Sequence, residues 1–383
     1  MSLFFITDAR FFITPDGTIY SGEYSFSDIL WQRYIDFFGE VKVIGRLFSI
    51  EEFDKKEHQV TNVDILPLPA FDNPLQFYFR QNEIKKLLEN YYKIYSPNSI
   101  IIRGAGAIGY LASKFCFKNK ILYGIEVIGD PYDVFAPGVI KHPLRPVFRS
   151  LFTKHQKNAV KNASSAIYVT SNKLQQKYPA NKIAFQTYAS DVVINEMVQN
   201  YKILDSNNDL KIISIGSLEQ MYKGPDVLLK AIKELINQKI TVSLTWLGHG
   251  KYLEEMLDLA RDLNIIEYVD FKGSVDAITL IKYLDESNVF VLASRTEGLP
   301  RAIVEAMARA LPCIGSNVGG IPELINEDLL FMSENYLELA SKIKLLFSDS
   351  EFYEKSSKYS LEKSSEFRQE ILEERRLSFF KSI

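Results

Sequence analysis

The stretch from Ser294 to Ala308 contains the residue types and spacing most suited to chemistry. Two glutamates eight positions apart, Glu297 and Glu305, flank the turn Gly298-Leu299-Pro300. The preceding residues 288–293 are apolar and β-branched, which predicts a buried strand, and apolar residues at helical spacing after the turn predict a helix. Free N–H groups at a helix start favour a phosphate, and a carboxylate accepts hydrogen bonds from vicinal hydroxyls. The spacing therefore predicts a diphosphate-binding site at the turn. The ribose of the ligand would lie near Glu305 and a second sugar, on the other side of the diphosphate, near Glu297.

The spacing alone also fits an ordinary strand, turn and helix with two solvated glutamates. The longer string continues with Ala306-Met307-Ala308 and Gly319-Gly320-Ile321-Pro322-Glu323. Together with Glu297-Gly298-Leu299-Pro300, it resembles the nucleotide-sugar motif of retaining GT-B glycosyltransferases of family 4, over residues 211–326. The resemblance implies transfer of a sugar from a nucleotide-sugar, expected to be a UDP-sugar, to an acceptor hydroxyl with retention. It implies no metal and no cofactor beyond the donor itself.

A second glycine-rich turn lies near the start of the second half of the chain. Residues 216–224 resemble the family's Gly-Arg…Lys-Gly segment, whose two cations hold the donor diphosphate. Gly216 and Lys223 match this segment, but Ser217 stands where an arginine is common. The resemblance therefore leaves two options: Arg301 or Arg295 covers the phosphate, or Lys223 acts with the helix start alone. We expect Lys223 and Glu297 to be catalytic and to matter more for turnover than for folding.

The remaining predicted site residues lie outside these two turns. Gly248 follows a strand, where a glycine permits close approach of a ligand. In the first half, the loop with Gly22 lies where the family's loop approaches donor and acceptor, although glycine is also common in plain turns. Family members commonly have a histidine that touches the donor sugar, whereas this chain offers Glu126 and Asp130 there. Asp130 is the predicted catalytic residue, with a simple turn at Gly-Asp-Pro as the alternative.

The first half also contains a competing motif. A strand at Ser99–Arg103 is followed by G-x-G-x-x-G at Gly104–Gly109, and a strand expected at Ile121–Ile125 ends in Glu126. This order is typical of a dinucleotide-binding turn and would indicate an NAD-dependent enzyme. The alternative is that the glycines let a helix pack closely on a sheet. A GT-B nucleotide-sugar epimerase and a non-catalytic binding module remain as further alternatives.

A basic segment follows that region. No Asp or Glu occurs from Val134 to Ser190, and apolar residues occur at helical spacing within 144–152. The nine cations are Lys141, Arg145, Arg149, Lys154, Lys157, Lys161, Lys173, Lys177 and Lys182. Such a pattern favours an anionic membrane surface bound through residues 141–161, and a lipid-linked glycan as acceptor. The alternative is a helix docked by its apolar side with its charges solvated.

Length and composition give the broad setting. A chain of 383 residues predicts two domains. We place them at 1–195 and 205–365, followed by a terminal helix at 366–383 that, by resemblance, crosses back to the first. The predicted fold class is α/β, with two Rossmann-like doubly wound parallel sheets facing across a cleft. The net charge of −3 argues against nucleic acid as a partner, and two cysteines indicate a cytoplasmic setting.

Overall fold

The computed structural model describes residues 1–26, 28–135, 142–194, 196–204 and 209–383. The chain divides into two compact units. The first unit comprises Met1–Ile128, Ser150–Ala189 and Glu374–Ile383, and the second comprises Gly129–Arg149 and Ser190–Glu373. Lys141 of the basic segment and residues 205–208 of the predicted domain boundary lie outside the described residues.

The first unit is built on a parallel sheet with a central reversal in strand order. Its strands, in spatial order, are β4 (Asp64–Leu68), β3 (Glu40–Ser49), β1 (Ser2–Ile13), β5 (Ser99–Arg103), β6 (Gly124–Val127), β7 (Ser165–Tyr168) and β8 (Phe185–Tyr188). The short β2 (Ile19–Ser21) pairs antiparallel with the end of β1. The order reverses between β1 and β5, which is the crevice where doubly wound sheets bind ligands.

The apolar start of β1 explains why this sheet is covered on both faces. Phe4 belongs to the core beneath the helices α2 (Pro74–Tyr95) and α3 (Ala107–Lys118). Its neighbour Phe5 points to the other face and packs on Trp31 and Tyr34 of α1 (Asp28–Phe38), with ring centroids 5.2 and 4.9 Å away. A strand with both faces buried therefore reads as a continuous apolar run.

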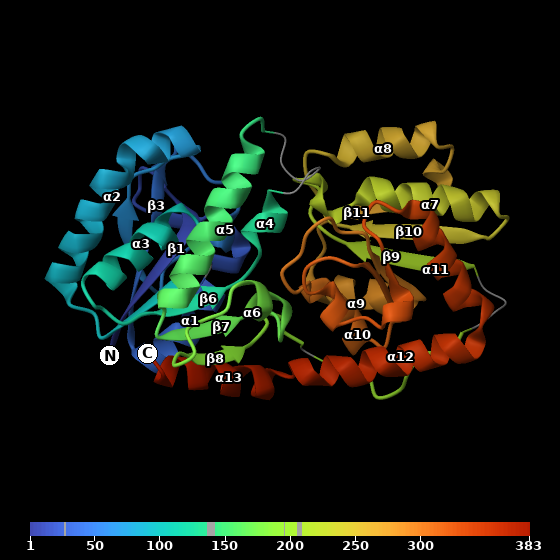
Figure 1. Cartoon of the computed structure of the whole chain (residues 1–383). Coiled ribbons are helices and arrows are strands. Elements are labelled where there is room, and N and C mark those ends of the chain that lie inside the picture. The colour runs from blue at the N-terminus through green and yellow to red at the C-terminus, as the bar shows by residue number, and fades with distance from the viewer. Residues whose placement is uncertain (27, 136–141, 195, 205–208) are drawn as a thin grey trace. The chain divides into compact units, whose positions relative to one another are not determined.

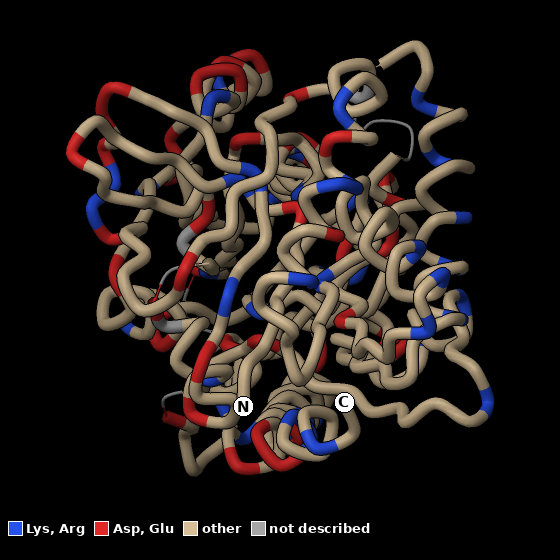
Figure 2. Tube along the Cα trace, turned by 90° about the vertical axis from the view of Figure 1, so that its left-hand side faces the viewer, with Lys and Arg blue, Asp and Glu red and all other residues tan. Residues whose placement is uncertain are grey.

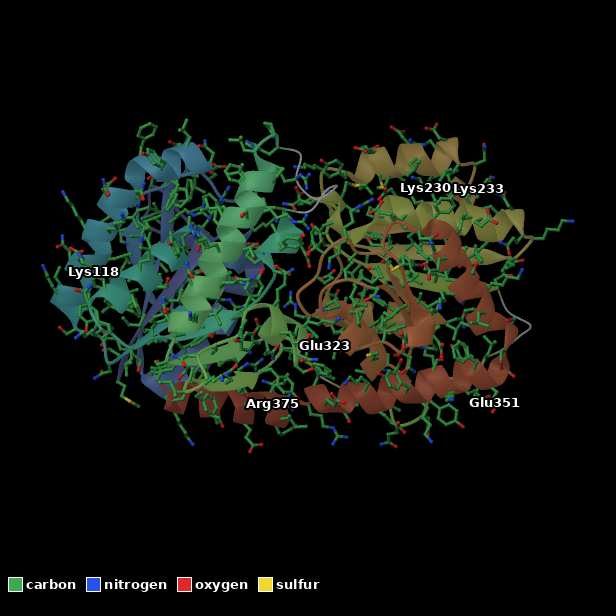
Figure 3. The ribbon with its side chains drawn as sticks, in the orientation of Figure 1. Lys118, Lys230, Lys233, Glu323, Glu351 and Arg375 are labelled. Atoms are coloured by element: carbon green, nitrogen blue, oxygen red, sulfur yellow. The ribbon has the colours of Figure 1, made fainter. Side chains whose placement is uncertain are left out.

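Three further helices belong wholly or partly to the first unit. They are α5 (Arg145–Asn162), α6 (Lys173–Lys177) and α13 (Gln369–Lys381). Figure 1 shows α2, α3 and α5 on one side of the sheet. The end of α13 lies against α1, because Phe380 packs on Tyr34, Phe37 and Phe38 at centroid distances of 5.3, 5.4 and 5.3 Å. Arg375, labelled in Figure 3, lies over the ring of Tyr188 at 4.0 Å.

The second unit repeats the same topology with shorter strands. In spatial order these are β11 (Val269–Gly273), β10 (Val242–Leu247), β9 (Leu210–Ile215), β12 (Val289–Leu292), β13 (Cys313–Ser316) and β14 (Leu330–Phe331), all parallel. Its helices are α4 (Pro131–Val134), α7 (Pro225–Asn237), α8 (Leu253–Asp262), α9 (Ala277–Glu286), α10 (Arg301–Ala308), α11 (Tyr336–Ser348) and α12 (Ser350–Ser364). The order reverses between β9 and β12. The prediction of two doubly wound α/β sheets is confirmed.

Three predicted element boundaries are wrong. The sequence predicts a helix from about Ser25 to Phe38, but this helix begins at Asp28, after a 3₁₀ turn at Tyr24–Phe26. The strand expected at Ile121–Ile125 begins at Gly124, because Lys120 has a left-handed φ of 57° and the Ile121 amide closes the turn after α3 on the Cys116 carbonyl. The terminal helix expected at 366–383 begins only at Gln369, after a 3₁₀ turn at Ser365–Phe367.

Candidate functional site

The two predicted glycine-rich turns lie on either side of the reversal point in the second unit. The segment 216–224 follows β9, and the segment 293–300 follows β12, its neighbour in the sheet. Because parallel strands end at the same edge, their following turns come together. Residues distant in sequence, Lys223 and Glu297, are thereby brought into contact.

Lys223 and Glu297 form an ion pair with low exposure. The Nζ of Lys223 donates to Oε1 of Glu297 at 2.6 Å, and their side chains are 13% and 8% exposed. The buried Ser294 hydroxyl donates to the same oxygen at 2.6 Å. Burial alone would lower the pKa of Lys223, but the Glu297 carboxylate outweighs burial, so its pKa is raised. Lys223 therefore remains a cation beside a fixed carboxylate.

Arg295 connects the two turns. Its guanidinium makes a two-pronged contact with Asp226, at 3.0 and 2.8 Å, and its Nε pairs with Glu334 at 2.5 Å. It also donates to the Met221 carbonyl, and its backbone N–H donates to the Tyr222 carbonyl at 2.6 Å. The Arg295 side chain is thus occupied in positioning the segment that carries Lys223, which favours Arg301 over Arg295 as the residue that covers the donor phosphate.

Glu305 lies in α10, the helix that begins after the turn Gly298-Leu299-Pro300, with Pro300 as the N-cap residue. Its carboxylate is partly buried, and burial raises its pKa, although the charge of Arg301 acts in the opposite direction. Among the described residues, no hydrogen bond or ion pair to Glu305 is found. Carboxylates removed from water are normally satisfied by donors. Glu305 is thus an acceptor available to hydroxyl groups of a ligand.

Two glycines of the site allow the turns to approach closely. Gly224 has a φ of +64°, and a Cβ there would lie 2.0 Å from the Ala293 carbonyl oxygen. Gly248 has a φ of +139°, and a Cβ there would lie 2.1 Å from the oxygen of Gly216. That oxygen also accepts from the Trp246 indole at 3.0 Å. A side chain at Gly224 would push the two turns apart, and one at Gly248 would push the segment after β10 away from the turn at 216–224.

Ser217 is exposed and its hydroxyl is engaged locally. It accepts from the Glu219 N–H at 3.2 Å and lies 3.4 Å from the His249 carbonyl oxygen. A neutral hydroxyl supplies no net charge to this segment. The positive charge expected at this position by resemblance must come from elsewhere.

The turn at Glu297 and Gly298 has a second support that our sequence reasoning did not assign. The N–H of Gly320 donates to the Gly298 carbonyl at 2.7 Å. Gly319 has a φ of +52°, and a Cβ there would lie 2.0 Å from the Glu297 carbonyl oxygen. The motif at 319–323 thus supports the backbone of the turn at 297–300. The adjacent glycines Gly319 and Gly320 were the sequence feature that could have indicated this support.

The site residues predicted in the first half of the chain are engaged in contacts within the protein. The Gly22 amide donates to the Arg10 carbonyl at 2.8 Å, so this glycine lies on the end of β1. Asp130 is 5% exposed and caps α4 by accepting from the Tyr132 N–H at 2.9 Å. Glu126, expected just beyond a strand, lies inside β6, where it pairs with Arg103 at 2.6 Å and accepts from the Tyr34 hydroxyl at 2.6 Å.

The competing G-x-G-x-x-G turn already holds an anion from the chain itself. The carboxylate of Asp8 accepts from the N–H groups of Ile108 and Gly109, at 2.9 and 3.2 Å. A Cβ on Gly106 would lie 2.6 Å from that carboxylate, and one on Gly109 would lie 2.2 Å from the Gly104 oxygen. The glycines therefore serve close packing, and the Asp8 carboxyl group already occupies the position where a dinucleotide phosphate would bind.

The described residues contain neither a candidate metal site nor a candidate membrane-spanning helix. Within these residues, no group of three His, Cys, Asp or Glu side chains could hold a metal ion. No described helix is both long and apolar enough to cross a membrane.

Comparison with known proteins identifies a family whose sequence model covers this site. Residues 199–363, which include both turns, match the family model for glycosyl transferases group 1. Protein CapJ of Staphylococcus aureus is 30% identical over 323 residues, covering 83% of this chain and 80% of CapJ. The chain belongs to the glycosyl transferases group 1. The protein is therefore a glycosyltransferase, and the NAD-dependent alternative is wrong.

Two further similarities are informative about this glycosyltransferase. The amylovoran biosynthesis glycosyltransferase AmsK of Erwinia amylovora is 32% identical over 137 residues, which are 34% of this chain and 33% of AmsK. HepE of Anabaena, solved in complex with UDP, covers all of this chain and is covered in full, with a TM-score of 0.68 and 14% identity. At that identity the similarity shows the fold alone, and the predicted GT-B fold is confirmed.

Proposed function

We propose that this glycosyltransferase moves a sugar from a UDP-sugar to an acceptor hydroxyl with retention at the anomeric carbon. The observation that carries the proposal is Glu305, a partly buried carboxylate without a described partner, placed in the helix behind a phosphate-binding turn. This geometry suits the two ribose hydroxyls of a nucleotide. HepE has been solved with UDP and with UDP-glucose, which supports UDP as the nucleotide.

The proposed chemistry uses the donor itself as the base. The bond between the anomeric carbon and the diphosphate oxygen breaks, and the acceptor oxygen bonds on the same face. The acceptor proton passes to the leaving diphosphate. Lys223 and the N–H groups at the start of α10 stabilise the growing negative charge, while Glu297 accepts from sugar hydroxyls and orients the transferred group. Asp130 is the proposed catalytic residue of the region after β6, and the mechanism requires no metal.

Nucleotide binding by the purified protein tests this proposal. A calorimetric screen of UDP, GDP and ADP should select UDP. Glu305→Ala should weaken UDP binding by ~1.5–3 kcal/mol, the range for hydrogen bonds to a charged group. Glu255→Ala, which removes an exposed glutamate from α8, is the matched control and should bind normally. Unchanged UDP binding by Glu305→Ala would contradict the proposal.

We propose further that the acceptor is a lipid-linked glycan of polysaccharide assembly, reached from the cytoplasmic face of an anionic membrane. The name of AmsK supports the pathway class, and α5 supports the surface. Leu144, Val147 and Leu151 are 53%, 58% and 43% exposed along one side of the α5 region. Exposed Lys154, Lys157 and Lys161 follow on the same helix. Figure 2 shows blue positions succeeding one another along its right-hand edge, where α5 lies.

Two arginines of this segment are engaged within the second unit. Arg145 donates to the Phe135 carbonyl at 3.0 Å, and Arg149 donates to the Tyr132 carbonyl at 2.7 Å while lying 3.4 Å from the Tyr132 ring centroid. The three lysines are therefore the better residues to change. Each basic residue near an anionic surface contributes about 1 kcal/mol, and salt screens it beyond ~8–10 Å.

Co-sedimentation with phosphatidylglycerol vesicles tests this surface. The wild type should bind at low salt and dissociate as salt rises. Replacing Lys154, Lys157 and Lys161 by Glu should abolish binding without changing UDP affinity. The same exchange at Lys230, Lys251 and Lys282 alters the net charge equally and should leave more binding. If the wild type ignores these vesicles at low salt, α5 is only a solvated helix.

A further inference from the structure

Most of the cations that the sequence places at the proposed donor site are already paired with carboxylates. Lys223 is neutralised by Glu297 at 2.6 Å. Arg295 is neutralised by Asp226 and Glu334 at 2.8 and 2.5 Å. Ser217 is uncharged. A nucleoside diphosphate brings at least two negative charges to these turns, so a further cation is needed.

Arg301 is the first residue of α10 and lies at the positive end of that helix. Its side chain is exposed, and the described residues offer it no hydrogen bond or ion pair. A cation at a helix start is unfavourable unless an anion is also present there. This helix has no acidic residue in its first turn. The position therefore suits a ligand anion better than it suits the isolated fold.

Two neighbours place Arg301 within the donor site. Glu305 is four residues later, which puts both side chains on the same side of α10, yet the two form no ion pair within 4.0 Å. The charge of Arg301 also acts on Lys223 and Glu305, where it opposes the net rise in the pKa of each. Arg301 is thus within electrostatic reach of both Lys223 and Glu305, with its own guanidinium uncommitted.

We propose that Arg301 binds the donor diphosphate and supplies the positive charge that Ser217 does not. The inference rests on the proposed function of this site as a nucleoside-diphosphate seat. A guanidinium presents paired donors that match two phosphate oxygens. The phosphate charge is then shared by Arg301, Lys223 and the N–H groups at the start of α10.

Calorimetry with UDP, UMP and uridine tests this role. Arg301→Ala should weaken UDP binding by about tenfold or more, and uridine binding should not change. Arg301→Lys should recover part of the loss. Adding Ser217→Arg to Arg301→Ala should also recover UDP affinity, because the cation then returns to the position common in the family. Arg261→Ala, an exposed arginine of α8, is the control.

The outcomes separate the two proposals. If the wild type binds UDP and Arg301→Ala binds it equally well, Arg301 has no phosphate role although the donor site stands. An equal loss for UDP and uridine would assign Arg301 to local structure and overturn the inference. If the wild type binds no nucleoside diphosphate, the proposed function fails and this inference with it.

Discussion

At the scale of single residues, the site combines one satisfied charge pair with two charged side chains that have no described partner. Lys223 and Glu297 neutralise one another, whereas Arg301 and Glu305 do not. A buried pair is costly to break from one side, because the remaining charge is left uncompensated. We therefore expect Lys223 and Glu297 to contribute to stability as well as to turnover.

Removing one member of that pair should destabilise the protein strongly. Lys223→Ala and Glu297→Ala should each lower the free energy of unfolding by ~3–5 kcal/mol, and both should lose transferase activity. The double variant Lys223→Met/Glu297→Gln should be more stable than either single variant yet remain inactive. Urea denaturation measures this coupling. Additive losses would show that the pair is not coupled in solution.

The raised pKa of Glu305 predicts opposite effects on stability and binding. Its folded pKa lies above the unfolded value of 4.5, so its stabilising contribution is complete below that pH and is lost as pH rises through the folded pKa. At pH 7, Glu305→Gln should therefore stabilise the free protein, by on the order of 1 kcal/mol, while weakening UDP binding. The stability gain should vanish near pH 4. A loss of stability at pH 7 would contradict this reading.

At the scale of elements, the site depends on turns that follow neighbouring strands and support each other. Arg295 joins the turn after β12 to the segment before α7, and Gly319 packs against the backbone of Glu297. In the first unit, the equivalent position after β5 is filled by Asp8. The two sheets share a topology, but the N-cap residue of α10 in the second unit makes no side-chain cap hydrogen bond.

Gly319→Ala should displace the phosphate turn. The new Cβ would lie 2.0 Å from the Glu297 carbonyl oxygen, so the backbone must shift, at a cost of ~1–3 kcal/mol. Gly17→Ala is the matched control, because Gly17 also has a positive φ, +85°, but nothing lies within 4 Å of its Cβ position. Gly319→Ala should lose UDP affinity and Gly17→Ala should keep it. Equal UDP affinity in both variants would show that the turn tolerates the clash.

At the scale of the whole molecule, the chain returns to its first unit at the end. Glu374–Ile383 belong to that unit, and Phe380 is 3% exposed among three aromatic rings of α1. The side chain of Ile383 would meet any Cβ placed on Gly124 of β6, at 2.5 Å. The first unit therefore lacks part of its core until the last ten residues have been made.

Phe380→Ala should destabilise the first unit by ~3–5 kcal/mol, as expected for a buried phenylalanine. Leu377→Ala, on the same helix but 40% exposed, should cost much less. Denaturation followed by tyrosine and tryptophan fluorescence measures both. A similar small loss for both variants would mean that α13 is dispensable for the stability of this unit.

Local patterns in the sequence were sufficient for the elements that form the donor site. The apolar run before the turn became β12. The sequence also predicts a helix at Pro225–Asn237, and α7 has those bounds in the structure. The spacing of Glu297 and Glu305 needed only a strand, a turn and a helix. Short strands without a distinct apolar period, such as β2 and β14, were not predicted, because two or three residues carry too little pattern.

The sequence by itself determined the sheet class, the glycine-containing turn after β12 and the family resemblance, since each depends on residues close together in the chain. Only the tertiary structure decided which charges neutralise each other. Lys223 and Glu297 are 74 residues apart, and Asp8 reaches the amide of Ile108 across 100 residues. Strand order brings such residues to the same sheet edge, and no local periodicity records it. For that reason only the tertiary structure shows that Arg301 and Glu305 have no described partner, whereas the charged residues around them form ion pairs.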